Sequence, residues 1–211
     1  MGELFHKLGG GTIIEIDQSG ASDMIEFFER IAREEGWQPG EQLRQQPETA
    51  RHLGVTVQNK LVGGVQVVLP TDDNKLPYSA VWPDIQMNPA KRAAEVTVLA
   101  IDKAFRGRAG IFWPLCTELW RLCVREQIGT LVLEATPEMF DKYCRAGWPL
   151  EIVGDLRMHW GENCYLCIMS VQAVAGSLLQ LALKSPTYRV LIDQAIRPGC
   201  NRRCGEAVAL A

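Results

Sequence analysis

The chain has 211 residues, of which 47% are hydrophobic and 22% are charged, and its formal net charge is −3. This length fits one domain, or one domain with an extension, and the proportions exclude a chain that is disordered throughout. The slight negative charge predicts no nucleic-acid partner. We find neither a secretory signal nor an apolar run of membrane-spanning length, so we expect a cytoplasmic protein without a transmembrane segment.

Seven cysteines form an odd set in a sequence without a secretion signal, which favours reduced thiols over a disulfide framework. Cys164 and Cys167 lie three apart in a predicted strand, so their side chains should point to opposite faces. Joint metal ligation would need a turn at that point. We therefore expect no metal site.

The first half of the sequence predicts a strand, two helices and a hairpin. Residues 11–17 are rich in β-branched side chains and predict a strand. Apolar residues at helical spacing predict a helix over 23–33, which Gly36 ends, and a short helix is expected over 41–51.

Two further strands follow, with Asn59 and Lys60 at the turn between residues 53–58 and 61–70. Gly63 and Gly64 in the second of these predict a bulge or a close backbone approach.

Residues 70–93 contain four prolines and form a long connection, a type that is usually functional or mobile. A central strand is predicted over 96–101, then an Arg/Gly turn, and then a helix that starts near Ile111 with Pro114 in its first turn.

The second half continues with a central strand over 130–135 and a helix from Pro137 to Gly147. A last hairpin is predicted over 151–171, and a helix over 172–184. These elements predict one α/β domain with a mixed central sheet over residues 1–185, followed by a helical extension and tail over 186–211.

The Arg/Gly turn reads FRGRAG from Phe105 to Gly110. A turn that leads into a helix presents unpaired N–H groups and the positive end of the helix dipole, an arrangement that suits a phosphate.

The order of strand EVTVLAID, turn FRGRAG, helix, strand TLVLEA and helix ending in YCRAGW resembles the core of the GNAT acyltransferase superfamily. Within it, the sequence most resembles the acyl-homoserine-lactone synthases and the N-acyl amino acid synthases. Gly36 and Trp37 after the first helix, the loop that precedes the central strand, and the glutamate that opens this strand carry this resemblance, which covers roughly residues 20–185.

The sequence departs from the lactone synthases at charged positions. Thr97 and Val98 stand where that family has Ser-Arg, Gln66 stands where an arginine is expected, and Ala109 replaces the first glycine of the turn motif. Since the lactone synthases would use such charges around S-adenosylmethionine, an amino acid acceptor fits these residues better.

The resemblance implies catalytic roles for three residues. Glu95 would be the general base, although it could instead be a surface carboxylate paired with Lys91 or Arg92. Thr97 would hydrogen-bond the acceptor, and Tyr143 would protonate the departing thiolate, unless they only pack in the core.

The resemblance also implies a donor site and a pocket. Backbone N–H groups of the strand would stabilise the oxyanion, and the turn would hold the phosphate of 4′-phosphopantetheine. The donor-binding residues are then Val98, Leu99, Ala100, Ile101, Arg106, Gly107, Arg108, Ala109, Gly110 and Ile111. The acyl or acceptor pocket would use aromatic side chains, namely Trp37, Tyr78, Trp82, Phe112 and Trp113.

We therefore expect an N-acyltransferase with no permanently bound cofactor, whose co-substrate is an acyl thioester carried by acyl carrier protein or by CoA. A cluster of basic residues would dock the acidic carrier, namely Lys91, Arg92, Lys103, Arg106 and Arg108. The alternatives are an acyl-homoserine-lactone synthase, a CoA-dependent acetyltransferase and a non-catalytic module that binds an acyl thioester.

Overall fold

The computed structural model describes residues 12–16, 21–39, 43, 48–71, 75–88, 91–107, 109–184, 186 and 189. Seven strands form one sheet in the order β1-β2-β3-β4-β5-β7-β6. Only β4 and β5 run parallel, and every other neighbouring pair is antiparallel. The strands are β1 (Thr12–Ile16), β2 (Ala50–Val57), β3 (Lys60–Val68), β4 (Ala93–Ile101), β5 (Thr130–Ala135), β6 (Leu150–His159) and β7 (Glu162–Ser170).

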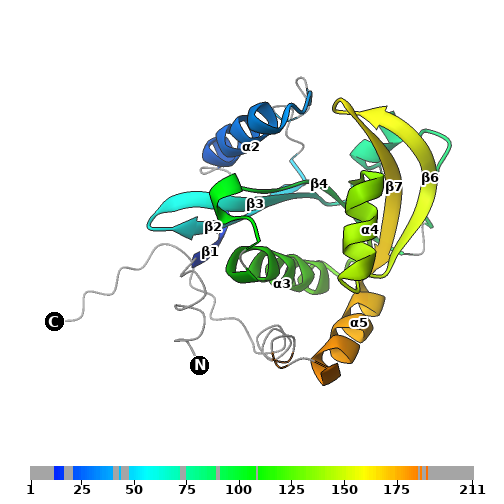
Figure 1. Cartoon of the computed structure of the whole chain (residues 1–211). Coiled ribbons are helices and arrows are strands. Elements are labelled where there is room, and N and C mark those ends of the chain that lie inside the picture. The colour runs from blue at the N-terminus through cyan, green and yellow to red at the C-terminus, as the bar shows by residue number, and fades with distance from the viewer. Residues whose placement is uncertain are drawn as a thin grey trace.

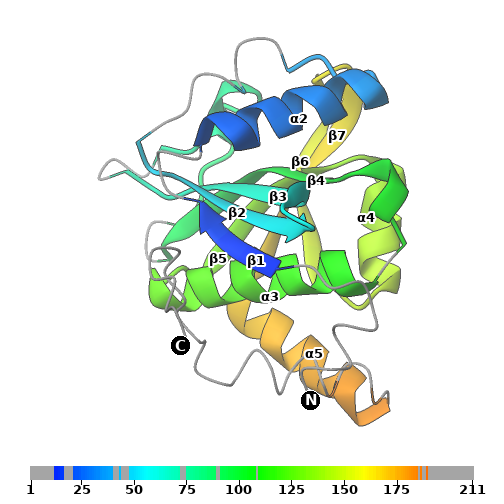
Figure 2. The ribbon, with the colours of Figure 1, turned by 90° about the vertical axis from the view of Figure 1, so that its left-hand side faces the viewer.

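Helices cover both faces of this sheet. Helix α2 lies over one face, and α3 lies over the other with α5 beyond it (Figures 1 and 2). Helix α4 packs beside the β6–β7 hairpin (Figure 1). The helices are α2 (Ala21–Glu35), α3 (Ala109–Arg125), α4 (Pro137–Arg145) and α5 (Val171–Lys184), with short 3-10 turns η2 (Pro77–Ala80) and η3 (Lys103–Phe105). Among the described residues, none of these helices is long and apolar enough to cross a membrane.

The predicted mixed α/β sheet is confirmed, and most element boundaries agree within two residues. Gly36 ends α2 with a φ of +77°, and Gln58 and Asn59 make the β2–β3 turn with positive φ values. The close approach at Gly63 and Gly64 is also confirmed: a Cβ at Gly63 would lie 2.8 Å from Ile111, and one at Gly64 would lie 2.6 Å from Met24. Small residues there let helices approach both faces of β3.

Two boundary predictions are wrong. The short helix expected over 41–51 does not include Ala50 and Arg51, because they pair with Val68 and Val67 and extend β2. Most of the earlier part of that predicted helix lies outside the described residues. Helix α3 begins at Ala109, before the predicted start, so Pro114 lies inside the helix and not in its first turn. Because proline has no N–H, the carbonyl of Gly110 lacks its usual intrahelical donor.

The sheet opens between its two parallel strands. β4 and β5 pair over only four residues each, from Ala93 with Thr130 to Val96 with Leu133, although β4 continues to Ile101. Directly after the last paired residue, Thr97 forms a β-bulge, since Val67 pairs with Val96 while Gln66 pairs with Val98. A bulge bends and twists its strand. The carboxyl-terminal half of β4 therefore leaves β5, and a gap opens in the middle of the sheet.

The described part of the connection between β3 and β4 contributes buried side chains to the core. Tyr78 and Trp82 are buried in a core cluster with Val132 and Leu166. The indole Nε1 of Trp82 donates to the carbonyl of Asp155, at 2.9 Å. The connection thus closes the sheet face next to α2.

We expect Gly154→Ala to destabilise the fold, because a Cβ at this position would lie 2.8 Å from Leu166 Cβ and 2.8 Å from the buried Trp82 ring. Overpacking of this kind lowers the free energy of unfolding by about 1–3 kcal/mol. Gly176→Ala in α5 is the matched control, since nothing lies within 4 Å of its added Cβ and alanine favours helix by about 0.5–1 kcal/mol. Urea unfolding of both variants tests this, and equal shifts would contradict it.

Candidate active site

A cavity of about 900 Å³ occupies the gap where β4 and β5 diverge. Its walls come from both strands, from α3 and α4, and from the β6–β7 hairpin. The β4 side is formed by Val96, Thr97, Val98, Leu99, Ala100 and Ile101. Since residues 97–101 have no pairing partner in β5, N–H groups of this segment that point toward β5 can stabilise an oxyanion in the cavity. The predicted use of Val98, Leu99 and Ala100 fits this geometry.

One arm of the cavity is apolar and lies toward α3 and α5. Trp113 and Trp148 stack with ring centroids 5.5 Å apart, and Phe112 meets Trp113 edge-on at 5.4 Å. The arm continues among aliphatic side chains of the core cluster, namely Leu119, Leu131, Leu133, Leu150, Met169, Val171 and Val174. Such a lining favours a hydrocarbon chain over a polar ligand.

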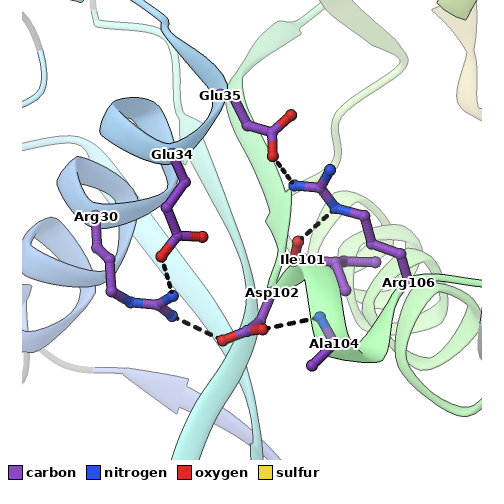
Figure 3. Close-up of polar contacts among 7 residues, drawn as sticks. All are labelled: Arg30, Glu34, Glu35, Ile101, Asp102, Ala104 and Arg106. Atoms are coloured by element: carbon purple, nitrogen blue, oxygen red, sulfur yellow. Dashed lines mark hydrogen bonds and ion pairs between the residues drawn. The ribbon is translucent and has the colours of Figure 1, made fainter.

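The turn between β4 and α3 is held by backbone and ionic contacts (Figure 3). Asp102 accepts a hydrogen bond from the N–H of Ala104 at 3.1 Å. It also forms an ion pair with Arg30 of α2 at 3.0 Å. Burial alone would raise the pKa of Asp102, but these donors hold it below its ordinary value. The carboxylate therefore stays ionised and fixes the start of the turn.

Arg106 and Gly107 both line the cavity, as expected. Gly107 has a φ of +74°, a conformation that favours glycine. Arg106 is tethered in two directions: its Nε donates to the carbonyl of Ile101 and its Nη2 pairs with Glu35 of α2, each at 2.9 Å (Figure 3). Any phosphate must share this guanidinium with Glu35.

The remaining residues expected to bind the donor are Arg108, Ala109, Gly110 and Ile111. Arg108 lies outside the described residues. Ala109 and Gly110 form the first turn of α3, where free N–H groups are expected. Ile111 does not line the cavity, because its side chain is buried in the core against Gly63.

Glu95 is buried, with 2% of its surface exposed, and its side chain is not part of the cavity wall. The expectation that its carboxyl faces the cleft, or pairs with Lys91 or Arg92 at the surface, is therefore wrong. The carboxyl instead accepts the N–H of Tyr78 at 2.8 Å. Burial raises the pKa of Glu95 to about 8; the Tyr78 hydrogen bond opposes this shift, and the nearby Glu134 adds to it.

Thr97 lines the cavity at the bulge, and its Oγ1 is buried with no hydrogen-bond partner within the described part of the chain. A buried hydroxyl without a partner is costly unless a ligand or water completes it. The position suits the predicted contact with the acceptor.

Tyr143 also lines the cavity, and burial, with a smaller contribution from Cys116, raises the pKa of its phenol to about 12. An ordinary thiol has a pKa near 8.5, so full proton transfer from this phenol to a thiolate is unfavourable. The phenol is better suited to donate a hydrogen bond to the leaving sulfur.

Of the five aromatic residues expected in the pocket, Trp37, Phe112 and Trp113 line the cavity. Tyr78 and Trp82 do not, and their assignment to the pocket is corrected: both are buried in the core cluster beneath the β3–β4 connection. Aromatic residues in a polar loop can either pack into the core or line a pocket. The sequence pattern alone does not distinguish these two cases.

The predicted basic cluster does not exist as one surface. Lys91 and Arg92 precede β4, whereas Lys103 and Arg106 follow it. Nine strand residues span about 30 Å, so the two pairs lie at opposite ends. Only Lys103 and Arg106 flank the donor turn among the described members of that cluster.

One ionisable pair in the cavity was not predicted from the sequence. Glu134 of β5 and His159 of β6 both line it, and Nδ1 of His159 lies 2.5 Å from Oε2 of Glu134. No short spacing signals this contact, since the residues are 25 positions apart. Among the described residues, no group of three or more His, Cys, Asp or Glu side chains is arranged to hold a metal ion.

Comparison with known proteins agrees with this architecture. The family model "N-acyl amino acid synthase FeeM" matches residues 33–172. The chain belongs to the FeeM family of N-acyl amino acid synthases. It is therefore an N-acyltransferase, an enzyme that transfers an acyl group to an amine. No curated protein sequence matches the chain.

Solved structures show the same fold. FeeM from uncultured soil microbes is 16% identical with a TM-score of 0.64, over 80% of this chain and 94% of FeeM. The CoA-dependent acyl-homoserine lactone synthase BjaI, solved with SAM and isopentyl-CoA, is 15% identical with a TM-score of 0.60, over 90% and 92%. A GNAT acetyltransferase from Staphylococcus aureus Mu50 is 14% identical with a TM-score of 0.52, over 77% and 99%. The GNAT-like fold of this FeeM family member is thereby confirmed.

We expect Glu95 to make folding stability fall as pH rises. Well below pH 4.5, its carboxyl is neutral in both the folded and the unfolded chain, so it contributes no pH dependence there. Between 4.5 and about 8 the unfolded chain loses the proton and the folded chain keeps it. The free energy of unfolding should then fall by up to about 1.4 kcal/mol per pH unit.

Glu95→Gln should remove this dependence, since the amide oxygen can still accept the Tyr78 N–H. Urea unfolding at pH 5 and pH 8 measures the effect: the variant should gain stability relative to wild type at the higher pH. Glu151→Gln, at an exposed carboxyl of β6, is the control and should follow wild type. Parallel wild-type and Glu95→Gln curves would contradict the prediction.

Proposed function

We propose that this enzyme transfers a long-chain acyl group from the thioester of acyl carrier protein to the amine of a small amino-acid-like acceptor. The observation that carries the proposal is the apolar arm of the cavity. It begins with the aromatic group of Phe112, Trp113 and Trp148 and extends into the core beneath α3 and α5. An acetyl group would use only a small part of this space.

The geometry supports a direct aminolysis. The acyl carbonyl would lie in the gap beside β4, where N–H groups of residues 98–100 stabilise the oxyanion. The amine attacks the carbonyl carbon, a C–N bond forms, and the C–S bond then breaks. Tyr143 donates a hydrogen bond to the leaving sulfur, and Thr97 positions the acceptor. Glu95, buried behind the cavity wall, takes part as the interior end of a proton relay.

The donor would enter over the turn between β4 and α3. The first N–H groups of α3 and the guanidinium of Arg106 would receive the pantetheine phosphate. Lys60 and Lys103 are exposed at this end of the fold and add positive charge near the turn. Such charges steer the docking of an acidic carrier protein.

The acceptor is proposed to be an amino acid rather than S-adenosylmethionine. Gln66 is a neutral buried residue of β3, and Thr97 and Val98 are neutral residues of β4. These positions therefore lack the arginines that the lactone synthases are expected to use around S-adenosylmethionine. A neutral amine with a small side chain suits this wall better.

Bacteria that overproduce the chain should accumulate new N-acyl amino acids, detected by mass spectrometry of organic extracts. This experiment needs no assumption about the acceptor, because the fragment masses identify the acyl chain and the amine together. Extracts from cells with an empty vector are the control. If acyl-homoserine lactones appear instead of N-acyl amino acids, the proposed acceptor is wrong. If no new lipid amide appears, long-chain transfer is refuted.

The same extracts from Glu95→Gln cells test the relay. We expect product to fall at least tenfold at equal protein level, because the ionisable group at the buried end of the relay is lost. Undiminished product would remove Glu95 from the chemistry while leaving acyl transfer in place.

Lys103→Glu should raise the KM for acylated carrier protein by about three- to tenfold at low salt with little change in kcat, because rim charges act mainly on association. Lys91→Glu is the matched control: it makes the same charge change about 30 Å away, at the other end of β4. Steady-state kinetics with acyl carrier protein measure both. Equal effects of the two variants, or transfer from acyl-CoA alone, would overturn the proposed carrier dock.

A further inference from the structure

A carboxylate–imidazole pair, Glu134 and His159, lies on the wall of the cavity. Oε2 of Glu134 and Nδ1 of His159 are 2.5 Å apart. Their side chains are 19% and 18% exposed, so the pair is mostly withdrawn from solvent but reachable through the cavity.

The fold brings these two residues together through the β6–β7 hairpin. Glu134 lies on β5 opposite Leu166 of β7, while His159 is the last residue of β6, directly before the turn. Trp160 and Gly161 make that turn with positive φ values. The carbonyl of Trp160 accepts the N–H of Gln38 at 2.8 Å, which ties the hairpin tip to the segment after α2. The imidazole is thus supported from two sides of the cavity.

Glu95 is close to this pair but cannot replace it at the substrate. On paired strands, Glu95 lies opposite Val132, two residues before Glu134 on the same face of β5. Glu134 lines the cavity and Glu95 does not. A group that takes a proton from a bound amine must come within hydrogen-bond reach of it, directly or through one water. The cavity wall provides this reach at Glu134 and His159.

The chemistry of the pair suits proton transfer. A carboxylate beside Nδ1 fixes the imidazole tautomer that carries its hydrogen on Nδ1, so Nε2 is the basic nitrogen. The carboxylate also stabilises the imidazolium that forms when Nε2 gains a proton. Histidine is well matched to accept and return a proton near neutral pH.

We propose that His159, held by Glu134, is the group that accepts the proton of the attacking amine. This inference rests on the proposed function and adds the group that deprotonates the acceptor amine. The neutral amine attacks the thioester carbon, and its lone pair forms the C–N bond while the carbonyl electrons move to oxygen. Nε2 of His159 takes the N–H proton. The tetrahedral intermediate collapses, the C–S bond breaks, and the thiolate leaves and takes up that proton, directly or through water.

The pH dependence of this step is set by several neighbours. Carboxyl, thiol, phenol and amino groups face the pair or share its cavity from β4, β5, β7, α2 and α4, namely Glu95, Glu134, Glu162, Cys164, Glu35, Glu138, Lys142 and Tyr143. The carboxylates dominate this set.

The test compares His159→Asn and Glu134→Gln with wild type in the full chain. Asparagine can keep a donor near the Nδ1 position while it removes Nε2, so it separates the structural contact from the base. The assay uses dodecanoyl carrier protein as donor and an equimolar mixture of amino acids as acceptor, with amide formation followed by mass spectrometry. We expect His159→Asn to lower kcat by about 100- to 10,000-fold and to abolish the acidic limb of the pH–rate profile.

Two further readouts identify a merely structural role. Added imidazole should restore part of the activity of His159→Ala, and the thermal shift of every variant with S-dodecanoyl-pantetheine should match wild type. Glu134→Gln should retain more activity than His159→Asn, because it keeps Nε2 and loses only the carboxylate that holds the ring.

Retained kcat with an unchanged profile in His159→Asn would overturn the role of the pair while leaving the proposed function intact. Loss of the thermal shift, or no rescue by imidazole in a folded His159→Ala, would assign the pair to structure instead. A wild-type enzyme that forms no amide would refute the proposed function itself.

Discussion

The site depends on one constraint: β4 and β5 pair for only four residues each and then separate. The bulge at Thr97 lies one residue beyond the last pair and turns β4 away from its neighbour. In a parallel pair that continued, those N–H groups of residues 97–101 that point toward β5 would bond to it and the space between the strands would be closed. Because the pairing stops, the same backbone becomes a wall with free donors. The cavity, its apolar arm and the N–H groups proposed to stabilise the oxyanion all follow from this interruption.

An interrupted sheet needs support from outside the gap. Helix α2 is joined to the turn after β4 by the pairs of Arg30 with Asp102 and of Glu35 with Arg106 (Figure 3). Each pair is partly exposed and contributes little free energy on its own. Their value is geometric, since they hold the donor turn against the helix on the opposite face. The hydrogen bond between Gln38 and Trp160 joins the hairpin tip to the same segment, so both edges of the gap are tied to α2 and its continuation.

Local patterns in the sequence predict the helices and strands well, but they predict the tertiary contacts between them poorly. β-branched runs, Gly36 and the turn at Asn59 mark boundaries because they act within a few residues. The bulge at Thr97 leaves no such mark, since it results from register between β3 and β4. The burial of Tyr78 and Trp82, the 30 Å between Lys91 and Lys103, and the contact of Glu134 with His159 also arise from tertiary packing. The β4 wall of the cavity could be predicted because it follows the chain continuously, whereas the wall that contains Glu134 and His159 is assembled from β5 and a distant hairpin.

Glu95 shows how the site and the stability of the fold oppose each other. A glutamine in its place could accept the same Tyr78 N–H without an ionisable group in the core. The carboxyl instead has a pKa near 8, so the folded chain must keep a proton that the unfolded chain releases at neutral pH, which lowers stability. A destabilising group of this kind is common where function requires it. Its neighbour Glu134 contacts the imidazole of His159 at the cavity, and the charge of Glu134 adds to the rise in the pKa of Glu95. On the proposed function, proton chemistry next to a divergent strand pair is a physical reason to keep an acid where packing alone would favour an amide.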